Sequence, residues 1–180
     1  MTRRPFSGSF QFNRVRLPRP VGGVETVLRP YLFVKLQHGK NTIDLLALVD
    51  TGADFSILPT EVAEELGIDP AQLPGEGLPF TGVTAGGAGK VVNLTVRTPQ
   101  DRGDVWLSME IPFVVIIKGG LGQGKDVLLG RHPLFHDFDF GFRMGYTDDP
   151  EIGKWTMKEI QKRKSASKYV RYEHMLRPEE

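Results

Sequence analysis

Short apolar runs and apolar–polar alternation fill much of the chain between residues 27 and 146, and this pattern predicts β-strands. The segments "YLFVKLQ" (31–37) and "TIDLLALV" (42–49) are predicted strands, with "HGKN" between them as a hairpin turn. The segment "FTGVTAGGAGKVVNLTV" (80–96) predicts two extended arms around a glycine-rich tip. Further extended segments are predicted at 105–117 (a strand pair or one long strand), 127–130 and 138–146.

Helical signals within this region are few and short. The segment "PTEVAEELGI" (59–68) predicts one short helix, with Thr60 as a candidate cap and Gly67 at a left-handed stop. A loop is predicted at 73–80, and a turn or short helix within 131–140. The pattern therefore predicts an all-β protein with one or two short helices.

The two ends of the chain differ from this body. Proline and glycine punctuate residues 1–26, which predicts an irregular N-terminal arm. Near the other end, Asp149 and Pro150 suit the N-cap and first position of a helix, and they predict a helical tail over 147–180. The domain between the two ends is predicted to span 27–146.

Charge divides the chain in the same way. Residues 1–20 hold five arginines and no acid, residues 151–180 carry a net +3, and residues 21–150 carry a net −7. Basic ends of this kind are either solvated termini or contacts for an anionic surface. Because the tail lacks a recognisable binding module, no nucleic-acid partner is expected beyond a weak contact of the basic tail.

The composition limits the classes of protein to which this chain can belong. A chain of 180 residues with 39% apolar and 25% charged residues fits a globular domain with extensions, and its 21 glycines and 13 prolines favour a turn-rich β fold. The absence of cysteine excludes disulfides, thiolate metal sites and cysteine nucleophiles, and it fits a cytoplasmic location. No apolar stretch is long enough to span a membrane, and no secretory signal is expected.

The stretch "LLALVDTGADFSILP" (45–59) ends an apolar run with an acid, a hydroxyl and a glycine. A carboxylate at the end of a buried strand is costly unless hydrogen bonds or charges surround it. Gly52 permits a close backbone approach that a side chain would block, and Thr51 supplies a hydroxyl for a neighbouring loop. Either this is a capped turn after a strand, or Asp50 has a chemical role.

A second motif, "DVLLGR" (126–131), follows about 80 residues after Asp50. Together with the first motif and the glycine-rich hairpin between them, it resembles the retropepsin-like aspartic proteases, over roughly residues 27–146. The segment "LFHDFDF" (134–140) is similar to sequences in the bacterial relatives of the retroviral enzymes, whereas His132 replaces the commoner Asp or Asn. The resemblance implies a closed acid-protease barrel.

The resemblance also implies roles for individual residues. Asp50 would be the catalytic carboxylate, and the active-site loop would be supported by Thr51, Gly52 and Ala53. Asp54 would form a structural ion pair with Arg131, and Ser56 matches a hydroxyl position. The flap that covers the substrate would be formed by Gly82, Val83, Thr84, Ala85, Gly86 and Gly87.

The aspartic mechanism needs two carboxylates that share one proton, and this chain contains a single Asp-Thr-Gly. We therefore expect a homodimer in which each subunit contributes Asp50, acting as an endopeptidase on peptide or protein substrates. No metal and no cofactor are expected. The alternatives are a non-proteolytic dimerisation or peptide-binding module of the same fold, and a partner-binding protein that works through its basic ends.

Other motifs are weaker. The segment "GGLGQGKD" (119–126) approaches a phosphate-binding loop but has Asp126 where a serine or threonine would bind magnesium. The four histidines show no metal-ligand spacing, and Asp137 and Asp139 are expected to be two solvated acids.

Overall fold

The computed structural model describes residues 6–19, 21–81, 86–99, 106–118, 126–143 and 153–160. Its strands are β1 (Ser7–Gln11), β2 (Asn13–Pro18), β3 (Val24–Arg29), β4 (Tyr31–His38), β5 (Asn41–Val49), β6 (Ser56–Leu58), β7 (Leu78–Thr81), β8 (Gly86–Pro99), β9 (Trp106–Lys118), β10 (Val127–Leu129), β11 (Phe138–Arg143) and β12 (Lys154–Glu159). Its helices are α1 (Thr60–Glu65) and α2 (Leu134–Asp137).

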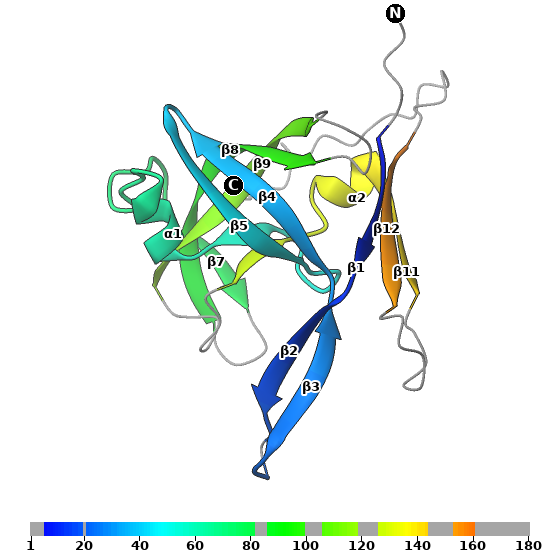
Figure 1. The fold of residues 1–180 in the computed structure, drawn as a ribbon. Helices are drawn as coiled ribbons and strands as arrows, with labels where there is room; N and C mark the ends of the chain where they lie inside the picture. The colour runs from blue at the N-terminus through cyan, green and yellow to red at the C-terminus, as the bar shows by residue number, and fades with distance from the viewer. Residues whose placement is uncertain are drawn as a thin grey trace, which may run out of the picture.

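Six strands close into a barrel in the order β4-β5-β10-β6-β9-β8, because β8 also pairs with β4 (Figure 1). Strand β7 extends the sheet beyond β8 as the first arm of a hairpin. Both described helices are short. The predicted all-β closed barrel with one or two short helices is confirmed.

The barrel encloses an apolar core that follows strand alternation. On β4 the inward side chains are Leu32, Val34 and Leu36, and all three are buried. Facing them are buried residues of β8 and β9, among them Leu94 and Phe113. Burying each such side chain stabilises the fold by about 1.5–3 kcal/mol, so the core sets which face of every strand points outward.

The strand order has a consequence for the ends of two strands. Strand β10 runs parallel to β5, with Leu128 opposite Leu48, and antiparallel to β6, with Leu128 opposite Ile57. Since parallel neighbours end at the same edge of a sheet, the residues after β5 and after β10 lie side by side. These are the two predicted motifs, which are about 80 residues apart in the sequence.

The prediction of an irregular N-terminal arm was wrong. Residues 7–11 form β1, the edge of a three-stranded sheet in the order β1-β12-β11 that lies beside α2 (Figure 1). In the same arm β2 pairs with β3 as a separate two-stranded ribbon. The apolar residues Phe6, Phe10 and Phe12 alternate with polar ones and turn inward, a period of two that the nearby prolines and glycines obscured.

The prediction of a helical tail was wrong where the structure describes it. Residues 154–159 form β12, which pairs with β1 and β11. Its Trp155 lies in a row of aromatic side chains, with Phe10 opposite it on one strand and Phe142 on the other. Tertiary packing of this row outweighs the helix signal of Asp149 and Pro150, which themselves lie outside the described residues.

Several smaller predictions are also settled. The hairpin turn between β4 and β5 is confirmed. Where the structure describes it, the segment predicted at 105–117 forms one long strand, β9 (Trp106–Lys118). The predicted loop at 73–80 overlaps the start of β7. Helix α1 is present and ends before Gly67 at φ +70°, but Thr60 is no cap, since its hydroxyl donates to the Ile116 carbonyl on β9 at 2.7 Å. No helix in the described part of the chain is long and apolar enough to cross a membrane.

Candidate active site

Asp50 lies directly after β5, at the edge of the sheet where β10 also ends. Its N–H donates to the Leu129 carbonyl at 3.0 Å, which continues the ladder between the two strands by one bond. The preceding side chain, Val49, is buried in the core. Strand alternation therefore places the Asp50 carboxylate on the opposite face from the core, together with Leu48.

The loop after Asp50 folds back onto its carboxylate. The N–H of Gly52 donates to Asp50 Oδ1 at 2.9 Å, and the N–H of Ala53 donates to the Asp50 carbonyl at 3.3 Å. A Cβ on Gly52 would lie 3.3 Å from the same Oδ1. These contacts fix the direction of the carboxylate. Thr51 is exposed, and its hydroxyl bonds to none of the described residues of its own chain.

Backbone hydrogen bonds join this loop to the residues that follow β10. The N–H of Arg131 donates to the Ala53 carbonyl at 2.8 Å, and the N–H of His132 donates to the Asp54 carbonyl at 2.9 Å. The buried Ser56 hydroxyl accepts from the Gly130 N–H at 3.2 Å. The two motifs therefore form one hydrogen-bonded unit.

Gly130 stands where the two segments cross. A Cβ built on it would lie 2.3 Å from both the carbonyl carbon and the carbonyl oxygen of Phe55. No side chain fits at such a distance, and both colliding atoms belong to the backbone, so they cannot rotate away. The glycine in "VLLGR" is therefore required by backbone packing.

Asp54 and Arg131 form an ion pair across the same crossing. In the single chain the pair is open to solvent, with 70% of the Asp54 side chain and 53% of the Arg131 side chain exposed. The large cost of breaking a buried pair therefore does not apply to the isolated chain, where an exposed pair contributes less than about 1 kcal/mol.

The described part of the glycine-rich hairpin consists of its two arms. Strand β7 pairs with β8 so that Thr81 is opposite Gly86 and Phe80 is opposite Gly87. The predicted flap residues Gly82, Val83, Thr84 and Ala85 lie outside the described residues. Farther down β8, Gly89 has no room for a side chain, because its Cβ would lie 2.7 Å from the Val115 carbonyl oxygen on β9 as well as 2.3 Å from Val114 Cγ1.

A row of apolar side chains crosses the sheet on the same face as the Asp50 carboxylate. Strand register puts Leu48, Leu128, Ile57 and Val114 directly opposite one another on β5, β10, β6 and β9. Ile57 and Val114 stand outside the main core cluster. We call these four residues the apolar row. Sequence reasoning missed it, although Leu48 sits two positions before Asp50 and so shares its face.

His132 packs edge-to-face against His136, with 5.2 Å between ring centroids. Burial, and secondarily the charge of His136, lower the pKa of His132 below its ordinary value, so its ring is neutral at neutral pH. Within the described ranges, His, Asp and Glu side chains form no group of three or more that could hold a metal ion. The His132 imidazole is therefore a neutral ring that packs against the rings of Phe55 and His136.

Comparison with known proteins bears on the two motifs. Residues 34–132, which are 99 of the 180 residues, match the family described as aspartyl protease, and this confirms the family predicted from the motifs. A solved structure that matches is a retropepsin-like aspartic protease from Rickettsia conorii, with 19% identity and a TM-score of 0.45, covering 89% of this chain and 99% of that one. No curated protein matches the chain.

The close contact between Gly130 and the Phe55 backbone predicts that a substitution at Gly130 lowers the stability of the fold. Gly130→Ala forces a Cβ against the Phe55 backbone, and overpacking of this kind costs about 1–3 kcal/mol. For a chain of this size the melting temperature should fall by about 2–4 °C for each kcal/mol. Gly141→Ala is the control, since its Cβ meets only the Thr156 hydroxyl, which can rotate away. Equal melting temperatures for the two variants would contradict the statement that Gly130 is required by the close approach of the Phe55 backbone.

Proposed function

Because the chain belongs to the aspartyl protease family, we propose that it is an endopeptidase that hydrolyses peptide bonds by water attack. The observation that carries this proposal is the Asp50 carboxylate, held on the outer face of the sheet by the Gly52 N–H. Membership of a protease family rests on the match over residues 34–132.

In the proposed mechanism one carboxylate accepts a proton from water while a second, protonated carboxyl group donates to the carbonyl oxygen of the scissile bond. Two carboxyl groups this close share one proton, because like charges at short range cannot both ionise easily. The water oxygen bonds to the carbonyl carbon and gives a tetrahedral intermediate. Its carbon–nitrogen bond then breaks as the nitrogen takes up the proton that the first carboxylate received from water. Asp50 acts as one of the two groups, and the loop backbone around it keeps its oxygens directed at the water.

The second carboxyl group is proposed to come from Asp50 of another copy of the chain. The sequence holds one Asp-Thr-Gly, and Asp50 lies at the edge of the barrel rather than in its core. A two-fold axis beside this edge would bring the two carboxylates together, and two-fold dimers are the commonest protein assembly. The Thr51 hydroxyl, which bonds to none of the described residues, and the exposed Asp54–Arg131 pair, which joins the two loops beside Asp50, would both lie near this axis.

Substrate would bind in an extended conformation over the same face. Leu48 and Leu128, the two half-buried members of the apolar row, offer a surface for apolar side chains beside Asp50. The hairpin of β7 and β8 supports the proposed flap, residues 82–87. An extended peptide can hydrogen-bond its backbone to strands and place alternate side chains against such a surface. A closed hairpin would exclude bulk water from the reacting groups.

Asp50→Asn is expected to abolish proteolysis, because the amide can neither accept the proton of water nor share one with a second carboxyl group. We expect a fall of about a hundred- to ten-thousandfold in the cleavage rate of casein, measured between about pH 4 and 7.5. Asp44→Asn on the same strand is the matched control and should remain active.

The outcomes of this experiment separate the alternatives. Cleavage by wild type and by Asp44→Asn, but not by Asp50→Asn, supports the protease. Cleavage by all three proteins at equal rates would contradict the role of Asp50. If no protein cleaves while all are folded and dimeric, the non-proteolytic peptide-binding module replaces the protease as the better account.

Dimerisation should be visible as mass and as a concentration dependence of activity. Light scattering is expected to give about 40 kDa, twice the 20.1 kDa of the chain. On dilution the activity per chain should fall as dimers dissociate. A constant 20.1 kDa species that retains full activity at every concentration would disprove the shared site.

Arg131→Ala should weaken the dimer more than the single chain. The pair with Asp54 is exposed in one chain, so its loss there costs less than about 1 kcal/mol. If the second copy covers the pair, an unpaired Asp54 is left in the interface and the dissociation constant should rise at least tenfold or so. Lys35→Ala, which breaks the Lys35–Asp44 pair farther from Asp50, is the control. Sedimentation equilibrium showing equal dissociation constants for Arg131→Ala and wild type would exclude a covered pair.

A further inference from the structure

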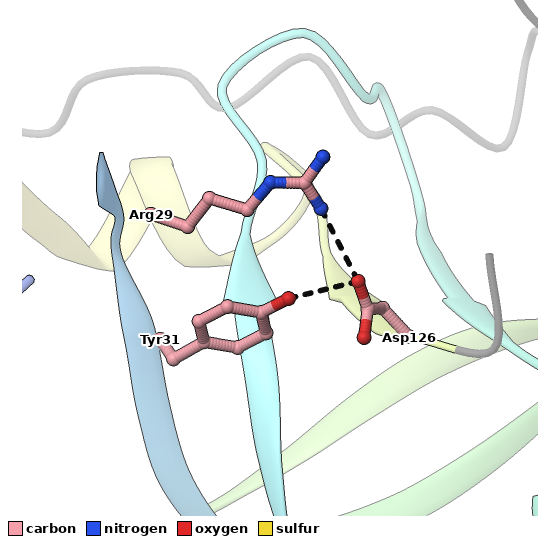
Figure 2. A network of polar contacts seen from close by, with 3 residues as sticks. All are labelled: Arg29, Tyr31 and Asp126. Atoms are coloured by element: carbon pink, nitrogen blue, oxygen red, sulfur yellow. Dashed lines mark hydrogen bonds and ion pairs between the residues drawn. The ribbon is translucent and has the colours of Figure 1, made fainter. Parts of the chain in front are cut away.

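Three polar residues meet on the outer face of the barrel, at some distance from the catalytic loop. They are Arg29 at the end of β3, Tyr31 at the start of β4, and Asp126 immediately before β10 (Figure 2). The Tyr31 hydroxyl donates to Asp126 Oδ2 at 2.8 Å, and Arg29 Nη1 donates to the same oxygen at 3.3 Å. We call these residues the Asp126 network.

Strand register puts this network on the face that carries Asp50. Asp126 precedes Leu128 by two residues, and Tyr31 is directly opposite Leu48, so both share the face of the apolar row. Val127 is opposite Ala47, so Asp126, one residue earlier, is level with Leu46 on β5, which lies four residues before Asp50. At about 3.3 Å per residue the carboxylate lies roughly 13 Å along the sheet from Asp50. An extended peptide bound over Asp50 would therefore reach it within a few residues.

Only one of the two carboxylate oxygens of Asp126 accepts a hydrogen bond from the described residues of its own chain. Both described hydrogen bonds end on Oδ2, and Oδ1 bonds to none of the described residues; Figure 2 shows it directed away from Arg29 and Tyr31. The side chain remains 39% exposed. An ionised carboxylate can accept about four hydrogen bonds, so capacity for a further donor remains.

The two partners hold the carboxylate in different ways. Burial, and then the bond to Asp126, raise the pKa of Tyr31 above its ordinary value, so the phenol stays a donor at neutral pH. Arg29 makes one longer contact rather than the two-pronged pair that binds carboxylates best. The network therefore orients Asp126 firmly through Tyr31 and neutralises it weakly through Arg29.

We propose that Asp126 is a specificity-determining residue of the peptide site, whose Oδ1 binds a lysine or arginine side chain of the substrate. This inference rests on the proposed function and names the class of substrate. Neighbouring exposed side chains on the same face, Phe33 and Leu46, would pack against the aliphatic part of such a side chain. The net charge of −7 over residues 21–150 would attract basic peptides to the same body.

The test uses a peptide that the 180-residue chain cuts, together with variants of that peptide in which one residue is changed to lysine or to norleucine. Norleucine keeps the length of the side chain and removes the charge. For wild type, the ratio of kcat/KM between the lysine and norleucine peptides should reach about tenfold at one position, the size expected for a hydrogen bond to a charged group. Asp126→Asn should bring that ratio close to one.

Two further variants separate recognition from folding. Tyr31→Phe keeps the ring but removes the donor that orients Asp126, so it should lower the ratio to an intermediate value. Asp44→Asn removes an acid from the same face of β5, two residues farther from Asp50 than Leu46 is. This variant should keep the wild-type ratio of kcat/KM between the lysine and norleucine peptides. Because each readout is a ratio within one protein, partial unfolding of a variant lowers both rates and leaves the ratio unchanged.

Each outcome decides the inference. No preference for lysine at any position in wild type, or a ratio that survives Asp126→Asn, overturns the specificity role while Asp50-dependent cleavage still supports the protease. A ratio that falls equally in Asp44→Asn assigns the preference to the overall acidic charge and also overturns it. No cleavage of any peptide by the dimeric wild type overturns the proposed function, and the specificity role with it.

Discussion

The site depends on one close backbone contact, in which Gly130 passes the Phe55 carbonyl at a distance that no side chain could occupy. Around this crossing, the Arg131 and His132 N–H groups donate to the Ala53 and Asp54 carbonyls, and Ser56 accepts from Gly130. These bonds form only if β10 is inserted between β5 and β6, so the strand order of the barrel and the position of Asp50 are set together. A larger residue at the crossing would collide with the Phe55 backbone and push the two loops apart.

The same arrangement supports the proposal that one chain carries half of a hydrolytic site. The proposed catalytic loop follows the end of β5, and the described hydrogen bonds of Asp50 run to Leu129, Gly52 and Ala53 of its own chain. A charged group in that position is most useful when a second carboxyl group approaches it, since each then controls the proton of the other. The exposed Asp54–Arg131 pair beside it has the character of an interface residue pair rather than of a core ion pair.

Much of this could be predicted from the sequence, because the motifs are local. The roles expected of Asp50, Gly52, Gly130 and Arg131 came from the resemblance of their two motifs to the retropepsin-like proteases, and the strands on either side were predicted from their apolar runs. The edge sheet was not, since β1 and β12 pair residues about 150 positions apart and their alternation is masked by prolines and glycines. The apolar row and the Asp126 network also depend on register between four strands, which periodicity within a single strand does not define.

The central claim, that two chains contribute Asp50 to one site, is tested most directly by mixing. Wild-type chains would be combined with an equal amount of Asp50→Asn chains and allowed to exchange subunits before activity is measured. If each active site needs Asp50 from both chains, half of the wild-type chains become trapped in inactive mixed dimers, so the activity per wild-type chain should fall to about half. Activity per wild-type chain that stays unchanged after complete exchange would mean that each Asp50 acts independently, and a rise to about 1.5-fold would mean that one Asp50 is sufficient for a shared site. Either result would contradict the account.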